Sequence, residues 1–390
     1  MMKVALDLRA CQFSNYATRG IGYYSKNLVN NILKYDRHNE YVIFGYKGIG
    51  DFLGYKKEKN ISEIELFGYL PLGLNQRMFI QRKGIESTYF NYWLKRRKID
   101  LVLSFLSGDG QVKLEVGRVC KLVRIFYDLI PLLFGNHYFL DEKSKIEYLY
   151  NLKEFENSDS IITISNNSKN DLLKYIDFKP DKIKVIYPGV SETNFSEDNF
   201  SAKKLAEYGI KNKYLLYVGG YDYRKNVESI IKAFARQEND IKNNFQLVFA
   251  GDAGQPQKDK LKALAQKHDL GNKVIFTGFV PDQDIIHLYR NAVALVYPSL
   301  YEGFGMTVLE AMTNHCAVIT SKSSSLGEIA KNYALTFDPT KVSKISQTMY
   351  QIITDNDLRN DLRKRAFDYA KNYNWKITAI ETIKFLQQSI

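Results

Sequence analysis

The stretch Tyr297–Met312, YPSLYEGFGMTVLEAM, joins the end of an apolar run to a segment with the composition of a helix. The apolar run is Ala292–Tyr297, and a proline ends it before the glycine-spaced turn Glu302–Gly305. A short apolar run, a glycine turn and a helix in this order are typical of one unit of a parallel α/β sheet. The two charges in the stretch are carboxylates, Glu302 and Glu310, although the chain has a net charge of +12.

Apolar runs alternate with helical patterns on both sides of this stretch. In the second half, the expected strands are Tyr214–Val218, Phe245–Phe249, Val274–Phe276, Ala292–Tyr297 and Ala317–Thr320. The expected helices of this half are Val227–Ala235, Lys258–Lys267, Asp284–Asn291 and Met306–Asn314. In the first half, the expected strands are Val4–Leu8, Tyr41–Phe44, Leu101–Phe105, Leu122–Phe126, Ile161–Ile164 and Ile183–Ile186. Two helices are expected in that half, Lys26–Lys34 and Asn167–Tyr175. The alternation indicates βαβ units and therefore parallel sheets.

The length of 390 residues favours two domains, because one hydrophobic core rarely extends over a chain this long. We expect an α/β protein with two doubly wound parallel-sheet domains in tandem. The expected segments are a first domain at 1–190, a linker at 191–212, a second domain at 213–365 and a helix crossing back at 366–390. Ligands of such sheets bind at the carboxyl ends of the strands, so the expected site is a cleft between the domains.

The composition excludes several classes of protein. Hydrophobic residues make up 45% of the chain and charged residues 25%, as in a globular domain. The first residues lack the uninterrupted apolar stretch of about 7–15 residues of a signal peptide. No run reaches the ~18 apolar residues that a membrane span needs. The three cysteines lie far apart without metal-ligand spacing, so we expect reduced thiols in a cytoplasmic protein.

The charge balance of 55 basic against 43 acidic residues favours anionic partners. The chain shows no zinc-finger spacing or other nucleic-acid signature, so nucleic acid is not an expected partner. Phosphorylated small molecules and an anionic membrane surface fit better. The stretch Arg77–Lys98 holds seven basic residues and one acid, with aromatic residues between them. It predicts either membrane contact or a helix with one apolar side and one solvated side.

Glycine turns follow the expected strands of the second half. Gly219 and Gly220 end the first of them, in YVGGYDYRKN, and single glycines end the next two. Glycine lets the backbone approach a ligand closely, and the start of the following helix favours an anion. Arg224 and Lys225 add positive charge, so this turn predicts a diphosphate site. The alternative is an ordinary strand-end turn followed by solvated charges.

The two glutamates suit a different part of the same ligand. A carboxylate accepts hydrogen bonds from sugar hydroxyls, whereas it repels a phosphate. Glu302 and Glu310 would flank a ligand with hydroxyls at both ends and phosphates between, and a sugar nucleotide is such a molecule. Gly303 and Gly305 let the turn present N–H groups at the start of the helix. The alternative, two solvated charges, fits Glu310 poorly because its neighbours in the chain are apolar.

The order of these motifs resembles that of the retaining glycosyltransferases of family 4, which have two Rossmann-like domains in the GT-B architecture. The most specific motif is the pair Glu302 and Glu310 with seven residues between them. YVGGYDYRKN, FTGFVPD, ALVYPS, SSSLGEIA and YNWKITA also stand where the family pattern expects them. In the first domain, ALDLRA, RGIGYYSKNL, ITISNNSKNDLLK and VIYPGV resemble the opening strand, a glycine loop and the segment before the linker. The resemblance covers nearly the whole chain.

The resemblance implies a role for each matching residue. Arg224 and Lys225 neutralise the donor diphosphate, and Glu302 faces the donor hexose. The residues implied to contact the donor are Gly20, Gly22, Gly219, Gly220, Phe279, Val280, Gly303, Phe304, Gly305, Met306, Thr307 and Glu310. Within this set, Glu310 binds the ribose, the backbone at 279–280 meets the base, and the two first-domain glycines close over the diphosphate. Such enzymes require no metal and no cofactor besides the nucleotide-sugar co-substrate.

One position departs from the family pattern. The family often has His-Asp after the fourth or fifth strand of the first domain, and here RIFYDLIPLLF has Tyr127 followed by Asp128. Asp128 is expected to keep a catalytic role, and Tyr127 is a candidate for contact with the acceptor or the transferred sugar. Tyrosine forms hydrogen bonds but does not match the proton exchange of histidine near neutral pH. His137 nearby is expected to be a loop residue, with a substitute base as the alternative.

Together these features predict a metal-independent hexosyltransferase that retains the anomeric configuration. The favoured donor resembles GDP-mannose, with a UDP- or dTDP-sugar as the alternative. The expected acceptor is a glycan or lipid-linked saccharide in the synthesis of bacterial surface polysaccharide or glycoprotein glycans. The expected location is the cytoplasm or the inner face of the cell membrane, with Arg77–Lys98 as the membrane contact.

Two other classes of protein share some of these features. A non-catalytic sugar-nucleotide-binding partner subunit is the main alternative, and Tyr127 in the histidine position favours it. The four matching residues Arg224, Lys225, Glu302 and Glu310 count against it. A dinucleotide oxidoreductase is excluded, because G-x-G-x-x-G does not open the first helix with an acid about 20 residues later.

Overall fold

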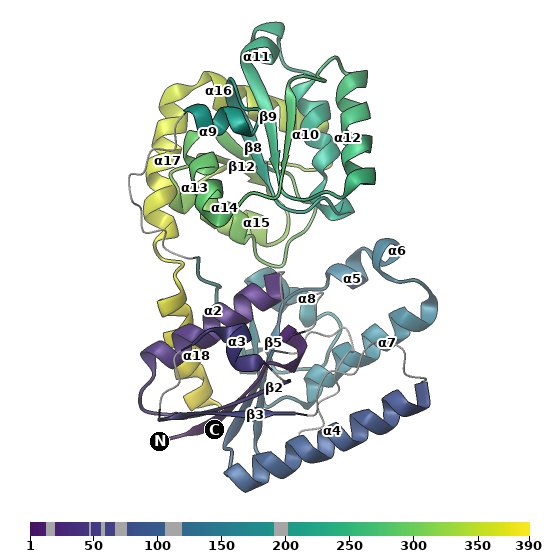
Figure 1. Cartoon of the computed structure of the whole chain (residues 1–390), viewed down its shortest axis with the longest axis vertical. Coiled ribbons are helices and arrows are strands. Elements are labelled where there is room, and N and C mark those ends of the chain that lie inside the picture. The colour runs from purple at the N-terminus through teal and green to yellow at the C-terminus, as the bar shows by residue number, and fades with distance from the viewer. Residues whose placement is uncertain (13–19, 47, 56–58, 67–75, 106–118, 191–201) are drawn as a thin grey trace. The chain divides into compact units, whose positions relative to one another are not determined.

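The computed structural model describes residues 1–12, 20–46, 48–55, 59–66, 76–105, 119–190 and 202–390 (Figure 1). Side chains are described at these positions except 10, 76–86, 202 and 203. Contacts divide the chain into a first unit, Met1–Gly189 with Trp375–Ile390, and a second unit, Val190–Asn374. From the sequence we expected these boundaries at 190 and 365. Most of the expected linker, 191–201, lies outside the described residues.

The first unit contains a seven-stranded parallel sheet. Its strands are β1 (Lys3–Asp7), β2 (Glu40–Gly45), β3 (Ile61–Glu65), β4 (Leu101–Ser104), β5 (Lys121–Phe126), β6 (Ser160–Thr163) and β7 (Ile183–Val185). They lie in the order β3-β2-β1-β4-β5-β6-β7, and every neighbouring pair is parallel. The chain therefore runs outward in one direction from β1 and in the other from β4, as in a doubly wound sheet.

Helices cover the faces of this sheet. Those described are α2 (Gly20–Tyr35), α3 (Ile49–Leu53), α4 (Gln76–Arg97), α5 (Ile130–Leu133), α6 (Gly135–Tyr138), α7 (Glu142–Lys153), α8 (Asn166–Leu172) and α18 (Trp375–Gln388). Short 3-10 helices are η1 (Arg9–Gln12), η2 (Glu154–Asn157) and η3 (Pro180–Lys182). The last helix, α18, packs beside α2 although 339 residues lie between Tyr35 and Trp375 (Figure 1). The ring of Trp375 meets the edge of Tyr24 at a centroid distance of 5.6 Å.

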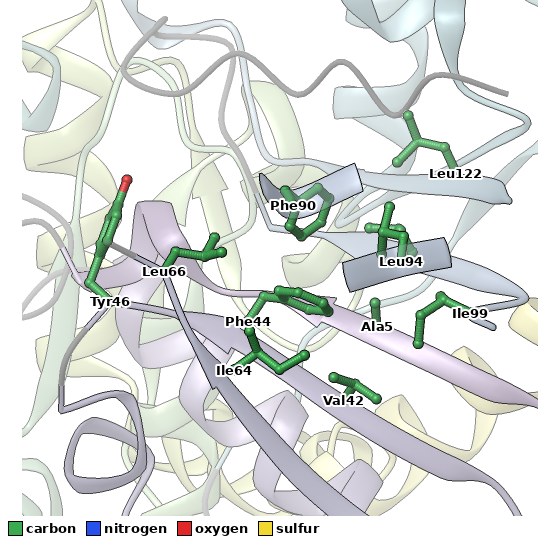
Figure 2. Packing of buried hydrophobic residues seen from close by; sticks show 11 residues of the cluster. Ala5, Val42, Phe44, Tyr46, Ile64, Leu66, Phe90, Leu94, Ile99 and Leu122 are labelled. Atoms are coloured by element: carbon green, nitrogen blue, oxygen red, sulfur yellow. The ribbon is translucent and has the colours of Figure 1, made fainter. Parts of the chain in front are cut away.

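The helix α4 contains most of the basic, aromatic stretch Arg77–Lys98. Figure 2 shows Phe90 and Leu94 of this helix among the buried side chains of the sheet, and the Phe44 and Phe90 rings lie 4.7 Å apart. The basic residues at the end of the helix, 95–98, are exposed. The described part of the stretch therefore has an apolar side on the core and a solvated basic side, as the second of its two sequence interpretations predicts. The side chains of its first basic residues lie outside those described.

The second unit contains a six-stranded parallel sheet. Its strands are β8 (Lys213–Val218), β9 (Phe245–Ala250), β10 (Val274–Gly278), β11 (Ala294–Tyr297), β12 (Val318–Ser321) and β13 (Leu335–Phe337). They lie in the order β10-β9-β8-β11-β12-β13. The surrounding helices are α9 (Ala202–Glu207), η4 (Tyr223–Lys225), α10 (Val227–Phe234), α11 (Asn239–Asn244), α12 (Gln255–Lys267), α13 (Asp282–Asn291), α14 (Met306–Thr313), α15 (Ser324–Ala330), α16 (Val342–Thr354) and α17 (Asn356–Ala370).

The strand order of the second unit determines where its site lies. The chain direction across the sheet reverses between the neighbours β8 and β11, which pair in parallel with Ala294 opposite Leu215. All four residues of β11 are buried, because a central parallel strand is covered on both faces. The turns that follow β8 and β11 therefore meet at the carboxyl edge of the sheet, at the place where ligands of such sheets bind.

The structure confirms the expected fold class of two doubly wound α/β units. Each of the expected strands overlaps an observed one, with ends shifted by two residues at most. Sequence reasoning missed the edge strands β3 and β13. Within the described stretches, no helix is both long enough and apolar enough to cross a bilayer.

Candidate functional site

The turn after β8 brings the backbone of two strand ends very close together. Gly219 has φ +142° and its N–H donates to the carbonyl of Ala250 at 3.0 Å. Gly251, with φ +137°, ends β9 on the other side of this contact, and a Cβ there would lie 2.3 Å from the Gly219 carbonyl oxygen. Glycine is therefore required at position 251 for both conformation and space, and at position 219 the positive φ favours it. Gly220 completes the turn, and its carbonyl accepts a hydrogen bond from the hydroxyl of Tyr217.

The turn after β11 is joined to the turn after β8. The N–H of Leu300 donates to the carbonyl of Arg224 at 2.7 Å. The turn ends at Gly305, which has φ +124° and directly precedes α14. A Cβ on Gly305 would lie 2.8 Å from Leu326, so this glycine too is needed for both conformation and space. Met306 and Thr307 then begin α14.

Arg224, Lys225 and Glu302 form one ion cluster at this place. Arg224 Nη1 donates to Glu302 Oε2 at 2.5 Å, and Lys225 Nζ donates to Glu302 Oε1 at 2.7 Å. The hydroxyl of Tyr297 lies 2.5 Å from Lys225 Nζ and 3.1 Å from Glu302 Oε1. Asp222 lies 3.1 Å from Arg224 Nε. Lys225 and Glu302 are buried, so these charges are paired in a largely water-free place.

The cluster holds its members in their charged forms. Burial by itself raises the pKa of Glu302, but the neighbouring Lys225 and Arg224 outweigh it and lower that pKa to about 2. Burial lowers the pKa of Lys225, whereas the Glu302 carboxylate raises it, and the net direction is upward. Both cations and the carboxylate are thus ionised at neutral pH. Glu302 is an acceptor of hydrogen bonds here and not a proton donor.

Glu310 lies in a contrasting environment. It is half-buried on α14, and the hydroxyl of Tyr289 on α13 lies 3.5 Å from its Oε2. Burial and the negative charge of Asp282 raise the pKa of Glu310 to about 7, against the smaller effect of the Tyr289 hydroxyl. The two glutamates of the motif therefore differ in charge state: Glu302 is ionised, and Glu310 takes up a proton near neutral pH.

Replacing Glu310 with glutamine should make the protein more stable above pH 7. The folded-state pKa of Glu310 lies above its ordinary value of 4.5, so the native protein binds more protons and the free energy of unfolding falls as pH rises from 4.5 to 7. Ionisation of a carboxyl with a pKa shifted this far lowers the free energy of unfolding by up to about 3 kcal/mol. Glutamine does not ionise, so Glu310→Gln should be more stable than the wild type by up to this amount at pH 8. Urea unfolding of both proteins at pH 5 and pH 8 measures the difference. Parallel pH curves for the two proteins would contradict the assignment.

The segment after β10 presents one exposed aromatic ring. Gly278 has φ +71°, Phe279 is 77% exposed and Val280 is buried. Phe279 and Val280 follow β10, which is separated from β8 by β9, and Asp282 then begins α13. The structure thus places 279–280 at the same carboxyl edge as the ion cluster. Their expected contact with the base stays a prediction.

The residues singled out in the first unit lie at the carboxyl edge of its own sheet. The helix α2 begins at Gly20, so Gly20 and Gly22 lie in its first turn and the expectation of a glycine loop there is wrong. A Cβ on Gly20 would meet nothing within 4 Å. Asp128 Oδ1 accepts a hydrogen bond from the N–H of Ile130 at 2.9 Å, which shapes the start of α5.

Tyr127 is buried beside α2. Its hydroxyl lies 3.4 Å from Ser25 Oγ, and its ring meets the edge of Tyr24 at a centroid distance of 5.5 Å. Its carbonyl accepts a hydrogen bond from Ser168 Oγ at 2.6 Å. These contacts fix the orientation of Tyr127, and its contact with a sugar stays a prediction. His137, which we expected in a loop, lies in the short helix α6.

Sequence reasoning missed three groups that hold the cluster together: Tyr297, Ser324 and Ser325. The signal for Tyr297 is a tyrosine at the end of an otherwise aliphatic strand. The two serines follow β12, and nothing in their spacing links them to Glu302. Among the residues that the structure describes, no group of three or more His, Cys, Asp or Glu is placed to hold a metal ion.

Two family models match the chain. "Glycosyltransferase Family 4" matches residues 20–194, and "Glycosyl transferases group 1" matches residues 200–369. The chain is 30% identical over 287 residues to the serotype-specific mannosyltransferase WbdA of Escherichia coli, covering 71% of this chain and 35% of the relative. It thus spans about a third of the length of that relative. It is 25% identical over 373 residues to the O-antigen chain mannosyltransferase B of Escherichia coli, covering 94% and 96%.

Solved structures of other proteins share the fold. The sucrose-phosphate synthase from Thermosynechococcus elongatus matches with a TM-score of 0.74 at 18% identity, over 100% of this chain and 99% of the other. Anabaena Alr3699/HepE, in complex with UDP and glucose, matches with a TM-score of 0.74 at 16% identity over the full length of both chains. The two family models together span nearly the whole chain and the solved structures match it over its full length, so the protein belongs to glycosyltransferase family 4 and has the GT-B fold.

Proposed function

We propose that this protein transfers a hexose from a nucleotide-diphosphate sugar to a growing surface polysaccharide, with retention of the anomeric configuration. The observation that carries the proposal is the paired cations Arg224 and Lys225, held by Glu302 where the turns after β8 and β11 meet. Mannose is the favoured sugar, because two relatives are named as mannosyltransferases. A GDP-linked donor is favoured, with a UDP- or dTDP-sugar as the alternative.

The cations suit the diphosphate of the donor. Lys225 Nζ has three N–H donors, and Tyr297 and Glu302 accept two of them. The third is available for a phosphate oxygen. As the sugar leaves, negative charge builds up on the diphosphate, and buried cations already held in place stabilise it without having to reorganise. This supplies the charge that a metal ion supplies in other enzymes, so we propose a metal-independent reaction without a cofactor.

The two glutamates suit the hydroxyls of the donor. A carboxylate has about four lone-pair sites. Arg224, Lys225 and Tyr297 occupy three of those on Glu302, which leaves at most one for a hydroxyl of the hexose. Glu310, with its pKa near 7, both accepts and donates hydrogen bonds around neutral pH, which suits the adjacent hydroxyls of a ribose because each hydroxyl can donate and accept. The nucleotide base would then lie against Phe279 and Val280, beside the exposed ring.

The acceptor is proposed to attack the hexose on the face from which the diphosphate leaves. The configuration at the anomeric carbon is then retained, and the departing phosphate oxygen takes the proton of the acceptor hydroxyl. Tyr127 and Asp128, at the carboxyl edge of the first sheet, are the proposed contacts for the acceptor or the transferred sugar. A lipid-linked saccharide at the inner face of the membrane is the proposed acceptor class, with the exposed basic end of α4 towards the lipid.

A donor panel tests this function. GDP-mannose at 100 times its dissociation constant should stabilise the protein by about 2.7 kcal/mol and raise the melting temperature by several degrees. UDP-glucose, ADP-glucose and dTDP-rhamnose should give smaller shifts at equal concentration. Release of GDP with an O-antigen saccharide as acceptor, unchanged by EDTA, then shows transfer without a metal. Binding of GDP-mannose without any release of GDP would instead support the non-catalytic partner subunit.

A further inference from the structure

A pair of serines after β12 lies against the backbone of Glu302. The N–H of Glu302 donates to Ser324 Oγ at 3.0 Å. Ser325 Oγ lies 2.8 Å from the carbonyl oxygen of Glu302 and 2.5 Å from that of Phe304, and Ser325 is fully buried. The serines thus bond to the backbone N–H and the backbone carbonyl of Glu302, while the ion cluster binds its side chain. None of these serine contacts has a part in the proposed function.

Glu302 is thereby held through every polar group that it has. Its two carboxylate oxygens accept from Arg224 and Lys225, and its backbone bonds to the serine pair. The holding groups come from three separate segments: the turn after β8, the end of β11 and the start of α15. A carboxylate fixed in this way keeps both cations at fixed positions as well, because its two oxygens bond to one each. The serine pair is therefore connected to the cations through a single residue.

Ser324 is in a strained conformation at this contact. Its φ is +54°, in the left-handed region that glycine adopts freely and other residues adopt at a cost. Strained residues of this kind persist where the surroundings hold them, and they gather at functional sites. Glycine would fit the backbone better at position 324, but it has no oxygen to accept the N–H of Glu302. The backbone conformation at position 324 thus favours glycine, whereas the hydrogen bond from the N–H of Glu302 requires a side chain with an oxygen, and serine supplies it.

We propose that Ser324 is a positioning residue: its hydroxyl sets the place of Glu302 and, through it, of Arg224 and Lys225. This inference rests on the proposed function, since the reaction depends on the place of these cations. Displacement of a catalytic group by about 1 Å costs up to about 100-fold in rate. Loss of the Ser324 hydroxyl should therefore lower kcat, while the donor KM changes less because the cations remain present.

Ser324→Gly separates positioning from stability. The variant loses the hydroxyl and also the backbone strain, so its melting temperature should stay within about 2 °C of the wild type. Its kcat for donor consumption should nevertheless fall by about tenfold or more, with a donor KM changed by less than about threefold. Ser324→Ala keeps the strain and loses the same hydroxyl, so it should show the same loss in kcat together with a lower melting temperature.

Asp269→Gly is the matched control. Asp269 is exposed after α12 and has φ +57°, so glycine relieves the same strain there without touching Glu302. This variant should keep its kcat within about twofold of the wild type. If Ser324→Gly also keeps its kcat, or if loss of kcat follows the melting temperature across the three variants, Ser324 has only a structural role and the proposal is overturned.

Hydrogen exchange gives a readout that does not depend on the donor. The amide of Glu302 bonds to Ser324 Oγ, so both variants at 324 should exchange this amide faster than the wild type, and Asp269→Gly should not. Unchanged exchange at residues 301–305 in both variants would overturn the proposal. If the wild type consumes no donor, the proposed function fails, whereas the exchange rates still decide whether Ser324 holds Glu302.

Discussion

Replacing Lys225 with alanine should lower the rate of sugar transfer by about 10²–10³-fold, which corresponds to about 2.7–4 kcal/mol of transition-state stabilisation. Lys225 is buried and bonded to both Tyr297 and Glu302, so its charge is already in place before the donor arrives. Water cannot replace it at low cost in a site of this kind. The effect should fall mainly on kcat, because the charge on the diphosphate is largest as the bond to the sugar breaks.

Arg224→Ala should show a loss of similar size, since Arg224 bonds to the other oxygen of the same carboxylate. Lys260→Ala is the control. Lys260 is also paired with a glutamate, Glu228, at 2.7 Å, but it is exposed on α12. Its replacement should change the rate by less than about twofold, because exposed ion pairs contribute about 0–1 kcal/mol. Turnover within tenfold of the wild type in both cluster variants would contradict the assignment of the cations.

Replacing Glu302 with glutamine should destabilise the protein by about 3–5 kcal/mol at pH 7. The change leaves the buried Lys225 and the half-buried Arg224 without their shared carboxylate, and removal of one partner from a buried ion pair costs about this much. The rate of transfer should fall as well, because the same carboxylate holds the two cations. Urea unfolding gives the stability, and donor consumption gives the rate.

The stability effect of Glu302 should depend on pH in a definite direction. Its folded-state pKa of about 2 lies below the ordinary value of 4.5, so its contribution is fully present above pH 4.5. That contribution, about 3 kcal/mol for a shift of this size, is lost as pH falls from 4.5 towards 2. The wild type should therefore lose stability faster than Glu302→Gln between pH 5 and pH 2.5.

Glu228→Gln serves as the comparison for this pH effect. Hydrogen bonds from Lys260 and Lys232 also lower the pKa of Glu228, but its side chain is 32% exposed. Water screens such a pair, so its replacement should change the stability at pH 7 by less than about 1 kcal/mol. Equal losses of stability in Glu302→Gln and Glu228→Gln would show that burial does not strengthen the ion pairs of Glu302.

Strands were predictable where the sheet covers both of their faces. Strands β8 and β11 are almost continuous apolar runs, because a central parallel strand has no solvated side. Two edge strands, β3 and β13, were missed, whereas the other two, β7 and β10, were expected. Each missed strand has only one buried side chain, so its residues do not form the continuous buried apolar run of a central strand. The start of α2 at Gly20 was missed because glycines usually indicate a turn.

The residue types of the candidate site could be predicted from the sequence because they stand in short motifs that suit the proposed sugar-nucleotide donor. Glycines at strand ends, two adjacent cations and two spaced carboxylates all stand in short, continuous motifs. Which of these residues bond to one another could not be predicted from the sequence, because Arg224 and Glu302 are 78 positions apart and Glu302 and Ser324 are 22 apart. Only the pairing of β8 with β11 and of β11 with β12 brings those segments together at one edge.

The sequence by itself determined the class of fold and the kinds of group at the proposed donor site, since local pattern and residue chemistry suffice for both. Tertiary structure alone decided the charge states and the support of those groups. Burial together with two cations keeps Glu302 ionised, whereas burial beside an acid raises the pKa of Glu310. A pKa depends on which charges lie within a few ångströms and how much water reaches them, and both are set by segments far apart in the chain.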